Sequence, residues 1–202
     1  LEWINFIAQE KINILRSPKS YNSQFGAALT LLSLTKYHEL AIIETGISMP
    51  GEMNLMKKMI EPSHVILSNI GKEHIENFNS IDELRIEKEK ILKGTIHTYF
   101  KNNNFNFKRN IVEKGQEIHC EYNNKNEVFF IQQKDENSAK NFICCLGFLN
   151  QIEYDSKDIK ALSPYLPAIA LRFEKKSGIS NSVIINDSYQ NNFQSLKISL
   201  ET

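Results

Sequence analysis

Residues 38–93 read HELAIIETGISMPGEMNLMKKMIEPSHVILSNIGKEHIENFNSIDELRIEKEKILK, and this stretch decides the fold. It contains two short apolar runs, residues 40–43 and 65–67, separated by a segment long enough for a helix. Runs that are apolar on both faces are typical of buried parallel strands. The order strand, helix, strand predicts a βαβ unit, whose connection is right-handed by the general rule.

Each apolar run leads to a polar side chain close to a glycine. The first run leads to Glu44, and the second leads to Asn69, Gly71 and His74. Open parallel sheets bind their ligands at the carboxyl ends of the strands. We therefore expect a carboxylate, an amide and an imidazole at one edge of the sheet.

The composition limits what this edge can bind. A chain of 202 residues can bury one good core, with room for part of a second domain. The 24 Lys and Arg residues balance the 24 Asp and Glu residues, so no global charge favours nucleic acid or an anionic membrane. No apolar run approaches the roughly 18 residues of a membrane span, and the N-terminus does not resemble a signal peptide. The composition predicts an intracellular, cytoplasmic protein.

The cysteines carry no recognisable chemical pattern. Cys120, Cys144 and Cys145 are odd in number, and two are adjacent, which is typical neither of a disulfide framework nor of a CxxC metal site. Free cysteines usually behave as small buried residues. We expect Cys144 and Cys145 to lie on the buried face of a helix over residues 135–149.

Both ends of the chain are predicted to lie within helices. Residues 1–9 have helical apolar spacing without a preceding capping residue, and residues 193–200 resemble the first turns of a last helix. We therefore expect a fragment of a longer protein. Residues 11–15 predict a short strand, followed by a polar turn and a buried helix over residues 26–34. The start of that helix suits anion binding, although an ordinary loop and core helix explain it equally well.

Two further helices flank the second strand. Residues 52–60 have apolar residues at helical spacing, and we expect the methionines among them to fill the core. Ser80 and Glu83 form a capping box, which predicts a helix that reaches about residue 93. The charges of this helix, Lys88 included, are typical of a solvated face. The residues alone therefore give Lys88 no function.

The second half of the chain has a different pattern. Residues 96–131 form short alternating runs joined by Asn-rich turns, which predict antiparallel strands appended to the parallel core. Residues 135–149 and 155–162 predict helices, and residues 169–173 and 183–185 predict strands around Gly178. The fold class predicted is α/β, with a mostly parallel sheet flanked by helices and a small antiparallel appendage.

Six stretches, in register, resemble the Mur ligases of peptidoglycan synthesis. They are SPKSYNSQFG (17–26), ETGISMPGEM (44–53), SNIGKEH (68–74), EKEKIL (87–92), LRFE (171–174) and INDSYQNN (185–192). The resemblance covers nearly the whole chain. It is strongest to the members that add D-Ala-D-Ala to UDP-N-acetylmuramoyl-tripeptide, including a form that is fused to an alanine racemase.

The resemblance implies both a domain organisation and a reaction. Residues 1–168 would form an N-terminally truncated central ATP-binding domain with a P-loop-type sheet, and residues 169–202 a linker and the start of a Rossmann-like C-terminal ligase domain. ATP would phosphorylate the terminal carboxylate of the tripeptide, and the amine of D-Ala-D-Ala would attack the acyl phosphate. Positioning and cations, above all Mg²⁺, would carry most of this catalysis.

The resemblance also implies which residues bind Mg²⁺. Glu44 and His74 match metal ligands of the family, and Lys88 matches a lysine whose carbamylated form holds Mg²⁺ near the γ-phosphate. An imidazole is a poor ligand for a hard cation, so His74 rests on the motif alone. Carbamylation needs a neutral amine and turns a cation into an anion. Lys90, two positions further, is the alternative to Lys88.

The nucleotide site implied by the resemblance draws on distant segments. Asn141 matches a residue that contacts adenine, Arg172 a linker residue that reaches the nucleotide, and Asp187 a residue that holds the ribose. Asn22 matches a residue near the γ-phosphate.

Substrate contacts are implied for Ser20, Asn22 and Tyr189. The turn at 189–193 reads YQNNF where the family usually has Tyr-Asn-Ala-Asn-Pro, so this turn departs from the family pattern.

One family feature is missing from the sequence. The phosphate loop that ends in Gly-Lys-Thr or Gly-Lys-Ser is absent, and we expect it upstream of Leu1. These 202 residues alone should therefore neither hydrolyse ATP nor ligate, and ADP release from the purified chain would contradict this. Two alternatives remain: another ligase of the superfamily, such as a folylpolyglutamate synthase, or a degenerate nucleotide-binding module without catalysis.

Overall fold

The computed structural model describes residues 1–18, 20–68, 70–95, 97–98, 107–168 and 174–186. Helices and strands alternate through the first half, which confirms the α/β prediction. In chain order the elements are α1 (Glu2–Ala8), β1 (Ile14–Arg16), α2 (Gln24–Leu32), β2 (Leu40–Ile42), α3 (Glu52–Ile60), β3 (His64–Val65), α4 (Ile81–Glu89), β4 (His97–Thr98), β5 (Phe107–Val112), β6 (Gly115–Tyr122), β7 (Lys125–Ile131), α5 (Glu136–Gln151), α6 (Ser156–Leu162), β8 (Glu174–Ser177) and β9 (Val183–Asn186).

Among the described residues, the strands of the predicted βαβ unit do not pair with each other; each pairs with another strand. β1 and β2 are parallel, with Ile14 opposite Leu40, and β3 is parallel to β4. β2 and β3, the two strands of the predicted βαβ unit, share no ladder in the described part of the chain. Both are also shorter than the apolar runs that predicted them.

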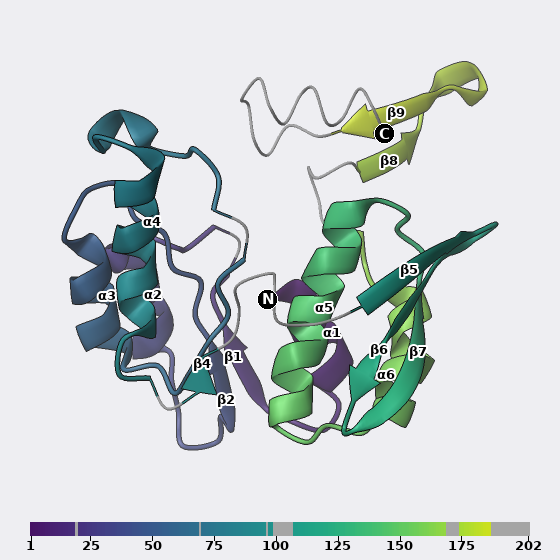
Figure 1. Ribbon diagram of the computed structural model, residues 1–202, viewed down its shortest axis with the longest axis horizontal. Coiled ribbons are helices and arrows are strands. Elements are labelled where there is room, and N and C mark those ends of the chain that lie inside the picture. Colours follow the sequence, from purple (N-terminus) through teal and green to yellow (C-terminus); the bar gives the residue numbers. More distant parts are fainter. Residues whose placement is uncertain (19, 69, 96, 99–106, 169–173, 187–202) are drawn as a thin grey trace.

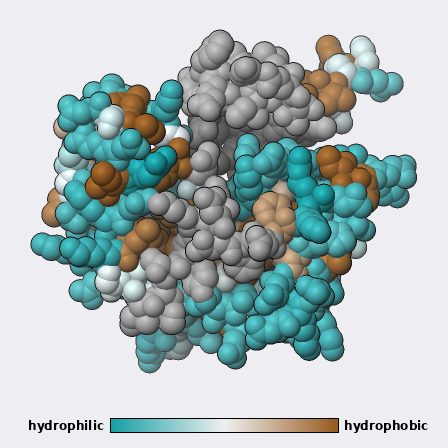
Figure 2. Space-filling view, in the orientation of Figure 1, coloured by the Kyte–Doolittle hydropathy of each residue, from teal (hydrophilic) through white to brown (hydrophobic). Residues whose placement is uncertain are grey.

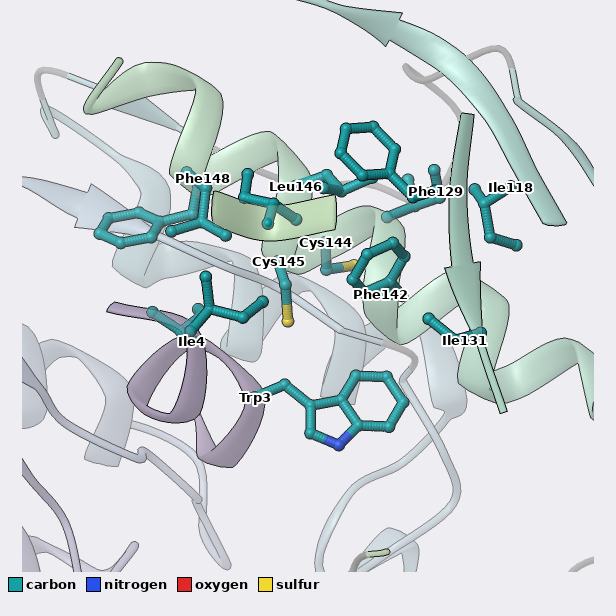
Figure 3. Close-up of a cluster of buried hydrophobic side chains, with 14 of the residues drawn as sticks. Trp3, Ile4, Ile118, Phe129, Ile131, Phe142, Cys144, Cys145, Leu146 and Phe148 are labelled. Carbon is teal, nitrogen blue, oxygen red and sulfur yellow. The ribbon is translucent and has the colours of Figure 1, made fainter. Parts of the chain in front are cut away.

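Two hydrophobic cores lie on opposite sides of the short parallel strands. Figure 1 shows α2, α3 and α4 on one side, and α1, α5, α6 and the sheet β5–β7 on the other. The larger core joins α1 and α5 to β6 and β7, and Figure 3 shows Trp3 and Ile4 of α1 directed toward Phe142 and Cys145 of α5. The smaller core is formed by α2, α3 and α4. Leu40 and Ile42 pack on the larger core and Ile43 on the smaller, so the β2 segment separates the two.

The larger core supports the cysteine prediction. Cys144 and Cys145 are buried on α5, and burial raises the pKa of the Cys144 thiol to about 12. Two tyrosines connect the surrounding elements: the Tyr122 hydroxyl donates to the carbonyl of Tyr154 at 2.7 Å, and the Tyr154 hydroxyl donates to the carbonyl of Ile7 at 2.9 Å. Burial raises the pKa of both phenols, Tyr122 more strongly. These cysteines and tyrosines have a structural role here.

The antiparallel appendage is the three-stranded sheet β5–β6–β7. Asn123 and Asn124 connect β6 to β7 with φ angles of 49° and 58°. Positive φ at both turn residues is the backbone of a tight hairpin, and Asn tolerates it better than most residues. The strand predicted over residues 183–185 is found as β9, whereas the one predicted over residues 169–173 lies outside the described residues. β9 pairs in an antiparallel hairpin with β8, a segment that was not predicted as a strand.

Helix α2 forms as predicted but is only partly buried. Its N-cap Ser23 accepts a hydrogen bond from the N–H of Gly26, and Gly26, Ala27 and Thr30 face the core. Phe25 and Leu32 are 73% and 82% exposed. The prediction of a buried helix is wrong for the face that carries Phe25 and Leu32. The small residues of α2 pack inward, and these large ones do not. Figure 2 shows apolar patches among polar side chains on the α2–α4 side of the molecule.

Helices α3 and α4 agree closely with the sequence. Met53 and Met56 of α3 are buried, as expected of core methionines. Ser80 caps α4 by accepting from the N–H of Glu83, and the Glu83 carboxylate accepts from the N–H of Asn79 at 2.6 Å. No described helix has the length and apolar character that a membrane crossing would require.

Candidate functional site

The ends of β1 and β2 are joined through a buried serine. The N–H of Ser17 donates to the carbonyl of Ile42 at 3.0 Å, which continues the ladder by one residue. The Ser17 side chain is fully buried, and its hydroxyl oxygen accepts a hydrogen bond from the N–H of Glu44 at 3.0 Å. Glu44 is therefore fixed at the carboxyl end of β2 through its backbone. This hydroxyl had no role in the sequence prediction.

Asn22 and Glu44 lie side by side at this edge. The Asn22 amide nitrogen donates to Glu44 Oε1 at 3.4 Å, and the Asn22 carbonyl accepts from the N–H of Gly46 at 2.7 Å. A Cβ on Gly46 would approach the Asn22 amide carbon to 3.3 Å, so a glycine permits this close approach. The structure thus brings together two of the residues proposed for the site. Ser20 is exposed on the same loop, and its carbonyl accepts from the N–H of Asn22 at 2.8 Å.

The loop after β3 contacts the loop after β2. The Asn77 amide donates to the carbonyl of Ser48 at 3.0 Å. His74 precedes the 3-10 helix Ile75–Asn77 and adopts a left-handed backbone with a φ of 59°. Its side chain is half exposed, with Nδ1 3.9 Å from Glu76 Oε1. His74 therefore lies on a loop after β3 that Asn77 ties to the loop after β2.

The two candidate lysines, Lys88 and Lys90, have different partners. The Lys88 side chain is 19% exposed, and its Nζ lies 3.9 Å from Oε2 of Glu73, the residue before His74. Lys90 Nζ instead donates to Oε2 of Glu87, on its own helix. Lys88 thus faces the His74 loop, whereas Lys90 is engaged with Glu87.

Glu87 is the residue that sequence reasoning missed. It was grouped with a solvated face, yet it is only 3% exposed. Its Oε1 accepts hydrogen bonds from the N–H groups of Gly51 at 2.8 Å and Met53 at 3.4 Å, at the start of α3. The available signal was spacing: Glu87 stands three residues after Leu84 and four before Ile91, both buried, on the apolar face of the α4 segment.

Metal binding can be tested against the donors present. Within the described ranges, no group of three or more His, Cys, Asp or Glu side chains is placed to hold a metal ion. A Mg²⁺ ion bound with a nucleotide takes one or two carboxylates from the protein and completes its shell with phosphates and waters. Glu44, a half-buried carboxylate beside the Asn22 amide, fits such a site.

The remaining candidates are distant in the chain. Asn141 is exposed in the first half of α5, on a helix whose other face is buried in the larger core. Arg172, Asp187 and Tyr189 lie outside the described residues.

Known proteins resemble this chain in sequence and in fold. The family model of the Mur ligase middle domain matches residues 2–158. The UDP-N-acetylmuramoyl-tripeptide–D-alanyl-D-alanine ligase of Rickettsia prowazekii is 27% identical over 99% of this chain, which spans 51% of that protein. This chain therefore covers about half the length of that relative.

Solved structures show the same fold. MurF from Acinetobacter baumannii matches with a TM-score of 0.83 at 17% identity, over 97% of this chain and 49% of that one. The MurF ligase of Thermotoga maritima, solved in complex with ADP, matches with a TM-score of 0.79 at 18% identity, over 99% of this chain and 52% of that one. With the family model matching more than three quarters of its length, the chain belongs to the Mur ligases, as a carrier of their middle domain.

Proposed function

We propose that the full-length polypeptide containing this sequence is an ATP-dependent ligase that joins D-Ala-D-Ala to UDP-N-acetylmuramoyl-tripeptide in the synthesis of peptidoglycan precursors. The observation that carries the proposal is the alignment of 99% of this chain with the Rickettsia prowazekii ligase of that name. The ADP complex of a related structure supports ATP as the nucleotide. Residues 1–168 would supply the central domain, and residues 169–202 the linker and the start of the ligase domain.

The chemistry proceeds in two balanced steps. An oxygen of the tripeptide carboxylate attacks the γ-phosphorus of ATP, and ADP leaves. The amine of D-Ala-D-Ala then attacks the acyl carbon of the resulting acyl phosphate, loses a proton and displaces inorganic phosphate. Charge develops on the transferred phosphoryl group in the first step, so fixed donors and cations around it lower the barrier.

The residues of the strand edge have separate roles in this proposal. Glu44, His74 and a carbamylated Lys88 would hold Mg²⁺, which neutralises the phosphate oxygens when bound. Asn22 donates a hydrogen bond to the Glu44 carboxylate and would lie near the γ-phosphate. Lys88 is preferred to Lys90, because Lys90 contacts Glu87 whereas Lys88 faces the His74 loop.

Asn141, Arg172 and Asp187 would bind the adenine, the nucleotide and the ribose. Ser20 and Tyr189 would join Asn22 in contacting the nucleotide-linked peptide. These roles follow from the family motifs, and each can be tested by single substitution.

The test is product formation by the full-length polypeptide. With ATP, Mg²⁺, UDP-N-acetylmuramoyl-tripeptide and D-Ala-D-Ala, mass spectrometry should detect the UDP-linked pentapeptide and an equal amount of ADP. Glu44→Gln should lower the turnover at least about 100-fold, since a charged contact to the phosphoryl site is lost. Glu121→Gln, an exposed carboxylate of β6, is the matched control and should retain activity. ADP release without pentapeptide, or unchanged turnover in Glu44→Gln, would contradict the proposal.

A further inference from the structure

A buried carboxylate on α4 completes the start of α3. Helix α3 begins after Gly51, which has no side chain to accept the free N–H groups of the first turn. Oε1 of Glu87, on a different helix, accepts the N–H groups of Gly51 and Met53. A negative charge is also favoured there by the helix dipole. Glu87 thus replaces the capping residue that α3 lacks.

Glu87 is buried, so its carboxylate depends on the hydrogen bonds that it accepts. A buried carboxylate is unfavourable unless hydrogen bonds compensate it. Here Oε1 accepts from two backbone N–H groups and Oε2 from Lys90, so both oxygens are satisfied. The carboxylate can therefore be retained at 3% exposure and can fix the distance between two helices.

The two segments that Glu87 joins both carry candidate ligands. The loop that ends at Gly51 starts at Glu44, and its near end is fixed by Ser17 and Asn22. Lys88 is the residue directly after Glu87 and faces the His74 loop through Glu73. One side chain therefore connects the far end of the Glu44 loop to the helix that presents Lys88.

We propose that Glu87 is a positioning residue of the ligase site, which sets the placement of Lys88 relative to Glu44 by capping α3 from α4. This proposal rests on the proposed function. Glu87 acts through the 45–51 loop and α4 and touches no reacting atom. A displacement of about 1 Å at a phosphoryl-transfer site can cost about 100-fold in rate. Loss of the Glu87 contacts with Gly51 and Met53 should therefore lower the turnover measurably.

The experiment compares Glu87→Ala, Glu87→Gln and Glu83→Gln in the full-length polypeptide. Glu83 is the matched control. It is also a glutamate of α4 whose carboxylate accepts a backbone N–H, but the donor is Asn79, just before α4, so the bond does not connect α4 to another helix. Glu87→Ala should lower kcat about 10- to 100-fold and raise the Mg²⁺ concentration for half-maximal activity, with the KM for ATP nearly unchanged. Glu87→Gln keeps an oxygen acceptor for Gly51 and Met53, and should recover most of the lost turnover.

Hydrogen exchange provides a readout that does not depend on activity. The amides of residues 51–53 should exchange faster in Glu87→Ala and at the wild-type rate in Glu83→Gln. Equal kinetics for Glu87→Ala and Glu83→Gln at matched folded fraction, or unchanged exchange at residues 51–53, would overturn the Glu87 proposal. A wild-type polypeptide that forms no pentapeptide while showing the predicted exchange pattern would instead overturn the proposed function, and with it the catalytic part of this inference.

Discussion

At the scale of residues, the site is held by contacts between backbone and side chain. Glu44 was predicted from its position after an apolar run and Asn22 from a family motif, and the structure places Asn22 Nδ2 3.4 Å from Glu44 Oε1. Ser17 was not selected, because a serine in a polar turn has no distinguishing pattern in the sequence. Its burial, and the hydrogen bond that it accepts from the N–H of Glu44, become visible only once β1 and β2 are paired.

The contribution of Ser17 can be measured directly. Ser17→Ala removes a fully buried hydroxyl and leaves the N–H of Glu44 without its acceptor, which should lower the free energy of unfolding by about 1–2 kcal/mol. Ser33→Ala is the control: its hydroxyl donates to the carbonyl of Leu29 on the exposed end of α2, so its loss should change little. Urea denaturation of both variants gives the comparison. Equal stabilities would mean that the Ser17 hydroxyl does not hold Glu44.

At the scale of elements, periodicity predicted most helices but not the pairing of the strands. The capping box at Ser80 and the methionines of α3 were predicted correctly because both follow from local spacing. Which strands share a ladder depends on long-range packing, and β2 pairs with β1 rather than with β3. Glu87 was misjudged for a related reason: a pattern that assigns charges to the outside does not detect a carboxylate whose donors belong to another helix.

An ion pair between β7 and α6 predicts a pH dependence. The Lys160 ammonium, by hydrogen bonding to Glu127, holds the pKa of that carboxyl below its ordinary value of 4.5. A lowered pKa in the folded state contributes stability above the unfolded pKa, and this contribution disappears as the pH falls through the folded value. Lys160→Met should therefore lower the free energy of unfolding by up to about 1 kcal/mol at pH 7. The pH-dependent part of this loss should decline as the pH falls below 4.5 and vanish once the pH is below the folded-state pKa of Glu127.

Lys157→Met on the same helix is the control, because the Lys157 side chain is exposed and its backbone N–H, which the substitution keeps, caps α6. Thermal unfolding at a series of pH values separates the two variants. Lys160 also lies over the ring of Phe129, and losing that contact gives an offset that does not change with pH. A Lys160→Met deficit that is constant from pH 3 to pH 7 would contradict the ion-pair contribution.

At the scale of the whole molecule, the short parallel strands separate two cores and carry the candidate site at their carboxyl edge. The larger core fixes α1 and α5, and the smaller one fixes α3 and α4, on which the 45–51 loop and Lys88 depend. The α/β class and this edge were predictable from two apolar runs and the residues that follow them. Asn141 is far along the chain on α5, and its role rests on family likeness because no local pattern distinguishes it.

The most direct test follows the oxygen of the tripeptide carboxylate. When that carboxylate is labelled with ¹⁸O and the full-length polypeptide is supplied with ATP, Mg²⁺ and D-Ala-D-Ala, the account predicts that one ¹⁸O atom appears in inorganic phosphate for each pentapeptide formed. Label transfer requires the carboxylate oxygen to bond to the γ-phosphorus and to leave with the phosphate. Pentapeptide formation with unlabelled phosphate, or labelled AMP in place of labelled phosphate, would contradict the acyl-phosphate ligase.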